Sequence, residues 1–258
     1  MLREGSPALS FSRVYLFAFA GYATHALLDA CTTYGTQLWL PFTNSRAAWN
    51  VVSVIDPLFT LPILLLILVA LIRRSTPWAV SAAGFAVLYL SLGLLQNHRA
   101  ETVATQLALS RGHDAVQLGV KPSFANILLW KSVYQHDGFY YVDAIRVGTE
   151  TKIYLGTRSA VLSLETHFPW LDPSSTQASD IERFRWFSND HLGLDPSNPM
   201  RIIDVRYSTI PNRLDGLWGI EMDPDRAKDE HVAFVNTRPQ GEALTPQFKQ
   251  LWSMLMGR

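Results

Sequence analysis

The sequence has a single cysteine, Cys31, so it holds no internal disulfide and no zinc or redox motif built on a cysteine pair. Lysine plus arginine number 22 and aspartate plus glutamate also number 22, and this net charge of zero gives no electrostatic reason to expect nucleic acid as a partner. Only 17% of the residues are charged, whereas 48% are hydrophobic. This composition excludes a disordered chain and a coiled coil.

Three common catalytic motifs are also missing. The sequence contains no Gly-x-Ser-x-Gly segment, no glycine-rich phosphate loop and no His-Glu-x-x-His segment. These motifs place a nucleophile, a phosphate group or a zinc ion at a fixed point of a known fold. No motif therefore supports a serine hydrolase, a nucleotide-binding protein or a zincin.

The charges that are present lie mainly in the second part of the chain. Residues 1–100 contain 6 basic and 3 acidic residues, which leaves 16 basic and 19 acidic residues for 101–258. The change predicts two domains. We expect an α-helical membrane region at 1–100, followed by a soluble, extramembrane α+β domain at 101–258.

Three apolar stretches occupy residues 11–28, 57–72 and 78–95. A helix needs about 20 mostly apolar residues to cross the hydrocarbon core of a bilayer, with roughly 17 as the lower limit. The third stretch is long enough to cross the bilayer. The second is long enough only if Asp56 enters the interface. The first is marginal, because His25 and Asp29 lie near its end. None has the polar stripe of a helix that packs on a soluble core. The sequence predicts about three transmembrane helices.

The first apolar stretch has an alternative interpretation as a signal peptide. Arg3 and Arg13 would form the basic flank, and residues 18–20 would form a small-residue cleavage site. That site would cut through the apolar segment itself, so we favour a retained helix.

Basic residues beside the stretches predict the orientation. Arg73 and Arg74 lie in a short hairpin, where the positive-inside rule applies most strongly, so the hairpin should be cytoplasmic. Residues 101–258 would then lie outside, in the periplasm if the membrane is a bacterial inner membrane. Arg3 and Arg13 agree with this orientation, whereas Arg46 mildly disagrees.

Residues 101–258 show the pattern of a compact α+β domain. Residues 101–111 predict a short amphipathic helix, a Ser179–Glu182 capping box predicts the start of another, and residues 245–256 predict a last one. Alternation and aromatic residues predict a hairpin that turns at 136–138. Further strands are expected at residues 152–155, 201–208, 217–222 and 231–237.

The chemistry-bearing residues lie between the first two apolar stretches. His25 and Asp29 are four residues apart, so on a helix they project from one face and could grip one divalent ion. Asp56, at the start of the next stretch, could complete the site. The alternatives are a hydrogen-bonded His25–Asp29 pair that anchors the helix, and a helix-capping role for Asp56 just before Pro57.

The surroundings of these residues make the pattern more specific, because they resemble the membrane-bound, metal-dependent hydrolase family. Members are bacterial inner-membrane proteins, also described as LexA-binding hydrolases. The resemblance rests on His25-x-x-x-Asp29, residues 33–36, Pro41, Arg46, residues 55–57, Pro122, Asn126, Trp130, residues 184–188 and residues 204–207.

The resemblance implies metal-dependent hydrolysis, in which a bound ion activates a water molecule. We expect that ion to be zinc or manganese and to be held by His25, Asp29 and Asp56. Arg46 would bind an anionic group of the substrate, and a solvated or headgroup-facing arginine is its alternative. The family also has upstream an acidic Pro-Asp motif and a His-Arg-x-x-x-His motif, which this sequence lacks. A misassigned start, a fragment and the loss of half of the metal site remain open as explanations.

Two functional hypotheses follow. The first is a metal-dependent hydrolase in the bacterial inner membrane, which acts at the outer interface on a phosphoester or lipid-linked substrate. The second is a non-catalytic inner-membrane protein whose periplasmic domain binds a partner. The retained motifs favour the first hypothesis, and the missing upstream motifs favour the second.

Overall fold

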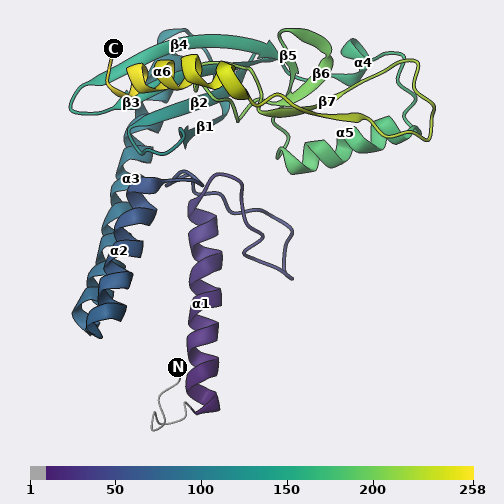
Figure 1. Ribbon diagram of the computed structural model, residues 1–258. Helices are drawn as coiled ribbons and strands as arrows, with labels where there is room; N and C mark the ends of the chain where they lie inside the picture. Colours follow the sequence, from purple (N-terminus) through teal and green to yellow (C-terminus); the bar gives the residue numbers. More distant parts are fainter. Residues whose placement is uncertain (1–9) are drawn as a thin grey trace.

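The computed structural model describes residues 10–258, so Arg3 lies outside the described residues. Helices α1, α2 and α3 project from one side of a domain that contains the strands found among these residues (Figure 1). Helices α2 and α3 form an antiparallel hairpin, and α1 stands apart from them. The C-terminal part of α3 continues into the domain and joins the two parts of the molecule.

The helices are α1 (Phe11–Cys31), α2 (Pro57–Arg73), α3 (Thr76–Ser110), α4 (Leu164–His167), α5 (Thr176–Phe187), the 3₁₀ turn η1 (Gly241–Ala243) and α6 (Leu244–Leu255). The strands form two antiparallel sheets of four. The first contains β1 (Val116–Pro122), β2 (Leu129–His136), β3 (Phe139–Val147) and β4 (Thr151–Ala160), and the second β5 (Leu192–Asp195), β6 (Asn198–Asp204), β7 (Trp218–Glu221) and β8 (Ala233–Asn236).

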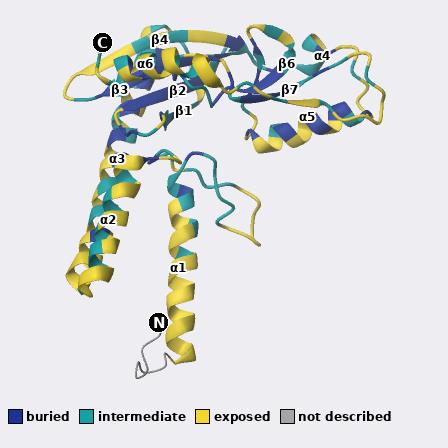
Figure 2. Cartoon of the chain, viewed as in Figure 1, coloured by how far each residue is buried: buried dark blue, intermediate teal, exposed yellow. Residues whose placement is uncertain are grey.

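Helices α1 and α3 are long and apolar enough to cross a membrane by length and composition, and the 17-residue α2 is shorter. Their side chains are mostly exposed, in contrast to the buried strands of the domain (Figure 2). Exposed Leu, Ile and Phe side chains along whole helices are unfavourable in water and favourable in lipid. The exposure pattern therefore agrees with the predicted membrane region.

The predicted helix at 101–111 is the last part of α3 and not a separate element. Ala100, Ala104 and Ala108 recur every four residues and are completely buried or nearly so. This small-residue face lets the helix lie close to the first sheet, where it packs with Trp130 and Ile145. The same helix therefore contains a membrane segment and part of the domain core.

The predicted hairpin is confirmed as β2 and β3. Asp137 and Gly138 form its turn with φ angles of 48° and 74°, and glycine adopts such angles without the steric penalty of other residues. The predicted strands at 152–155, 201–208, 217–222 and 231–237 correspond to β4, β6, β7 and β8. Sequence analysis did not predict β1 and β5.

Helix α5 begins one turn earlier than the predicted capping box. Ser175 is its N-cap, and the Ser175 hydroxyl accepts a hydrogen bond from the Ala178 N–H. Asp180 instead lies inside the helix, where it accepts hydrogen bonds from His231 and from the Val232 N–H. Ile181 and Phe184 of this helix belong to the core of the second sheet.

The loop between α1 and α2 packs against α3. The Asn97 side chain donates a hydrogen bond to the Asn50 carbonyl, at 3.1 Å. Gly93 lies beneath Val51 so closely that a Cβ at this position would come within 2.5 Å of the Val51 carbonyl oxygen. These contacts hold the loop against α3, and Thr33 and Tyr34 of the same loop contact Lys121 and Tyr207 of the domain.

Candidate functional site

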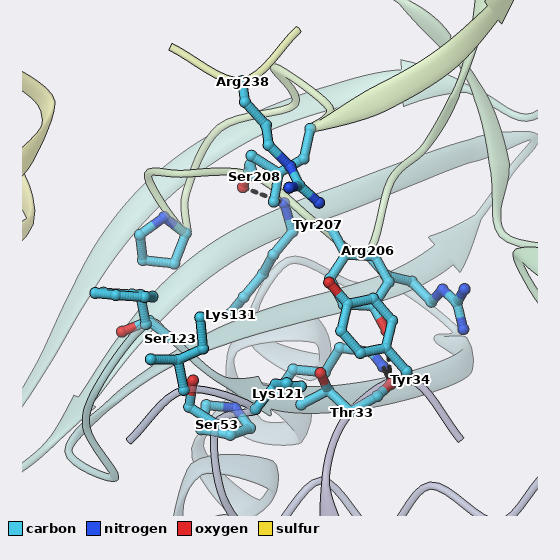
Figure 3. Close-up of a pocket in the computed structure, with 16 residues that line it drawn as sticks. Thr33, Tyr34, Ser53, Lys121, Ser123, Lys131, Arg206, Tyr207, Ser208 and Arg238 are labelled. Atoms are coloured by element: carbon cyan, nitrogen blue, oxygen red, sulfur yellow. Dashed lines mark hydrogen bonds between the residues drawn. The ribbon is translucent and has the colours of Figure 1, made fainter. Parts of the chain in front are cut away.

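A cavity of about 320 Å³ lies where the α1–α2 loop meets both sheets (Figure 3). We call it the lysine cavity, because Lys121 of β1 and Lys131 of β2 line it. Arg206 and Arg238 are its other basic lining residues, and none of its sixteen lining residues, all within the described part of the chain, is acidic. The cavity therefore has an excess of positive charge.

Lys121 and Lys131 are directly opposite each other in the β1–β2 register, so both side chains lie on one face of the sheet. Like charges in this arrangement repel each other, and Lys131 is also only 4% exposed. Burial lowers the pKa of each lysine to about 7. Strongly perturbed titratable groups that share a cavity indicate a functional site.

Each lysine has acceptors within the protein. The Lys121 ammonium donates hydrogen bonds to the Thr33 carbonyl at 3.0 Å and to the Asn50 side chain at 3.2 Å. The Lys131 ammonium donates to the Ser208 hydroxyl and to the Arg213 carbonyl, both at 2.8 Å. None of these acceptors carries a charge, so within residues 10–258 neither ammonium is neutralised by direct contact with a carboxylate.

The two arginines differ in how their charge is balanced. Arg206 is 7% exposed and forms a two-point ion pair with Asp204, at 2.6 and 2.8 Å. The exposed Arg238 guanidinium lies over the Trp218 ring, 5.3 Å from its centroid, and has no hydrogen-bonding or ionic partner among residues 10–258. Arg238 is therefore the basic side chain best placed to meet an incoming anion.

Aromatic side chains form one wall of the site. Tyr34 stacks on Tyr207 and Trp218, with ring centroids 5.1 and 5.9 Å apart. The Tyr207 hydroxyl donates to the Thr33 carbonyl at 2.6 Å, and burial raises the pKa of Tyr207 to about 12. Two segments that carry the family resemblance, 33–36 and 204–207, therefore meet here although they are far apart in the sequence.

The residues proposed to hold a metal are only partly brought together. The His25 and Asp29 side chains are 3.4 Å apart on α1, and both are substantially exposed. Asp29 and Asp56 line a second cavity of about 370 Å³, which adjoins the lysine cavity through Tyr34, Ser53 and Val54. His25 is not among its lining residues.

Asp56 is already engaged by protein donors. One carboxylate oxygen accepts from the Leu58 and Phe59 N–H groups, and the other accepts from the Tyr89 hydroxyl at 2.8 Å. Across residues 10–258, no three His, Cys, Asp or Glu side chains are grouped closely enough to hold a metal ion. The residues do not fit a three-ligand metal centre in this arrangement, and the metal site stays a prediction.

Arg46 binds the protein itself. Its guanidinium donates to the Tyr34 carbonyl at 2.6 Å and to the Phe187 carbonyl at 3.0 Å, and it lies 5.4 Å from the centroid of the Trp186 ring. These contacts tie the α1–α2 loop to the end of α5. Substrate binding by Arg46 stays a prediction, and Arg46 is not among the residues that line the lysine cavity.

Sequence reasoning did not single out Lys121, Lys131, Ser208 or Arg238. The available signal was Lys131, which stands in the otherwise apolar and aromatic part of a strand. A lysine is rarely buried unless it has a partner or a function. Its proximity to Lys121 depends on strand register, and its proximity to Ser208 depends on how the two sheets pack, so neither pairing was visible in the sequence.

Comparison with known proteins supports the membrane assignment. A family model described as "YdjM inner membrane protein" matches residues 5–100. The match covers α1, the α1–α2 loop, α2 and most of α3, and thus the part of the lysine cavity that the loop supplies. It supports an inner-membrane location and identifies no reaction. No curated protein and no solved structure gives a significant match.

Proposed function

We propose that this inner-membrane protein binds the phosphate-bearing headgroup of an anionic membrane phospholipid in the lysine cavity. The observation that carries the proposal is the grouping of Lys121, Lys131 and Arg238 around one cavity without an acidic lining residue. An anion would relieve the repulsion between the two lysines and would supply the charge-assisted partner that they lack.

The position of the cavity favours a lipid over a soluble anion. Its lining includes Val54 and Ile55, which come just before Asp56, the N-cap of α2, and the apolar Phe124. These three side chains are about half exposed, at 49%, 60% and 46%. A phospholipid headgroup could enter beside them while its acyl chains remain next to the apolar helices.

The proposed outside location of the domain rests on Arg73, the last residue of α2, and on Arg74, which follows it in the turn to α3. A phosphatase reporter fused after His113 should then be active, and one fused at Ser75 should be inactive. The reverse pattern would assign the lipid site to the inner leaflet and would leave its chemistry unchanged.

Binding of short-chain lipids to the detergent-purified full-length protein tests the proposal. Dihexanoyl phosphatidylglycerol should bind at least about tenfold more tightly than dihexanoyl phosphatidylcholine, and inorganic phosphate should bind more weakly than either lipid. Lys121→Met and Arg238→Gln should each weaken phosphatidylglycerol binding about tenfold or more. Lys152→Met, the same substitution at an exposed lysine, should have no effect.

Affinity should also depend on pH in a defined direction. Desolvation lowers the pKa of the Lys121 ammonium to about 7, with Arg206 lowering it further, Asp204 raising it and Arg46 lowering it. Both cavity lysines are therefore mostly charged at pH 6 and mostly neutral at pH 8.5, so the anion should bind more tightly at pH 6. Equal binding of both lipids by wild type and variants would refute the proposal.

Metal-dependent hydrolysis is a second candidate, because Asp29 and Asp56 line one cavity beside the lysine cavity. The same binding assay separates it from the first. Lipid binding through lysines should survive treatment with EDTA. The metal site would be supported instead if EDTA abolished binding or hydrolysis and zinc or manganese restored it. The variants His25→Ala and Asp29→Ala should then also lack this binding or hydrolysis.

A further inference from the structure

Among residues 10–258, Ser208 supplies the one hydroxyl that directly contacts a buried lysine of the cavity. The Ser208 oxygen lies 2.8 Å from the Lys131 nitrogen, and both residues line the lysine cavity (Figure 3). In this arrangement the Lys131 ammonium donates to Ser208, and the Ser208 hydroxyl donates to the main-chain carbonyl of Ile210 at 2.8 Å. Lys131 comes from β2 of the first sheet, whereas Ser208 follows β6 of the second. The packing of the two sheets therefore creates the contact, and no local sequence motif is involved.

Lys131 has the environment that a lysine base requires. It is 4% exposed, and burial lowers the pKa of its ammonium to about 7, which leaves a large neutral fraction near neutral pH. Two carboxylates, Asp215 and then Asp204, raise the pKa and oppose this effect, and Lys121 lies opposite on β1. A neutral amine at this distance can accept the proton of the Ser208 hydroxyl once that hydroxyl rotates from the Ile210 carbonyl toward the lysine.

We propose that Ser208 is a nucleophile and Lys131 its general base for hydrolysis of a carboxylic ester of the bound phospholipid. This proposal rests on the lipid site proposed above. A glycerophospholipid carries its acyl esters only a few bonds from its phosphate. A phosphate held by Lys121 and Arg238 therefore leaves an ester carbonyl within the same cavity as Ser208.

The reaction consumes one water molecule and needs no other co-reactant. Lys131 takes the proton of the Ser208 hydroxyl as the serine oxygen bonds to the ester carbonyl carbon. The bond from that carbon to the glycerol oxygen then breaks, and the leaving oxygen takes the proton from Lys131. Water next adds to the acyl carbon of acyl-Ser208 and gives a proton to Lys131. The fatty acid leaves, and Ser208 recovers its proton from Lys131.

Release of hexanoic acid from dihexanoyl phosphatidylglycerol by the full-length protein tests the reaction. Ser208→Ala should lower turnover at least about a hundredfold and retain lipid binding. Lys131→Arg should lower turnover similarly, because it keeps the positive charge but cannot give up its proton. Ser110→Ala is the control, since the Ser110 hydroxyl is exposed and also bonds a main-chain carbonyl.

Two further readouts separate catalysis from a structural role. At saturating lipid, wild-type turnover should rise with pH through about 7, because only the neutral form of Lys131 accepts a proton. A fluorophosphonate probe should form a covalent adduct at Ser208 in wild type, and this adduct should be much reduced in Lys131→Arg. Peptide mass spectrometry locates the adduct even if a variant is unstable.

The outcomes distinguish this proposal from the lipid site. Selective lipid binding without hydrolysis and without a Ser208 adduct would overturn the catalytic proposal and leave the binding proposal intact. Hydrolysis that persists in Ser208→Ala would also overturn it. If the wild-type protein showed no selective binding of phosphatidylglycerol, both proposals would be refuted together.

Discussion

Arg111→Met should lower the thermal midpoint of the full-length protein by about 6–20 °C, the equivalent of about 3–5 kcal/mol. Arg111 follows α3 and donates two hydrogen bonds to the Asp143 carboxylate of β3, at 2.7 and 2.8 Å. Asp143 is 1% exposed, so removal of the guanidinium leaves a buried carboxylate without its counter-charge. The ion pair thus fixes the C-terminal end of α3 to the first sheet.

Two variants control for this prediction. The double variant Arg111→Met/Asp143→Leu should recover much of the lost stability, because it removes the buried charge as well as its partner. Lys228→Met breaks the ion pair between Lys228 and Asp172, in which the lysine nitrogen lies equally close to a carboxylate oxygen, at 2.8 Å. Both of those side chains are exposed to solvent, which screens the pair, so the expected loss is much smaller than for Arg111→Met. Equal losses for Arg111→Met and Lys228→Met would contradict the structural account.

Gly93→Leu should destabilise the protein by about 1–3 kcal/mol and weaken phosphatidylglycerol binding at least severalfold. A Cβ at Gly93 would come within 2.5 Å of the Val51 carbonyl oxygen and 2.9 Å of a Val51 methyl group. The loop must then move, and it carries Asn50, which accepts a hydrogen bond from Lys121. The thermal midpoint and the lipid dissociation constant measure the two effects separately.

Gly84 supplies a matched control on the same helix. A Cβ at Gly84 meets nothing within 4 Å, so Gly84→Leu adds an apolar side chain to an open, apolar face. It should leave lipid binding unchanged. If Gly84→Leu and Gly93→Leu weaken lipid binding equally, the packing of the α1–α2 loop on α3 has no role in forming the site.

The elements were predictable from the sequence where their cause is local. The apolar stretches, the turn at Asp137 and Gly138, and the cap formed by Asp56 each depend on a few neighbouring residues. The start of α5 was misplaced because Ser179 has a glutamate three residues later, as in a capping box, whereas the true N-cap Ser175 has Ala178 there. Contacts with His231 and the Val232 N–H hold Asp180, the residue after Ser179, inside the helix.

The candidate site was much less predictable, because long-range packing builds it. The i, i+4 spacing correctly placed His25 and Asp29 on one face of a helix. In contrast, Lys131 reaches Ser208 across 77 residues of sequence, and Tyr207 reaches Thr33 across 174. The sequence around each residue does not encode these contacts. The packing of the two sheets brings Lys131 to Ser208, and the packing of the α1–α2 loop against the domain brings Thr33 to Tyr207.

Differential labelling of the five lysines with an amine-reactive reagent, read by mass spectrometry, tests the lipid site most directly. Lys121 should react half-maximally near pH 7, ahead of the exposed Lys152, Lys228 and Lys249. Dihexanoyl phosphatidylglycerol should protect Lys121, and dihexanoyl phosphatidylcholine should not. The account is contradicted if Lys121 titrates with the exposed lysines and phosphatidylglycerol leaves its labelling unchanged.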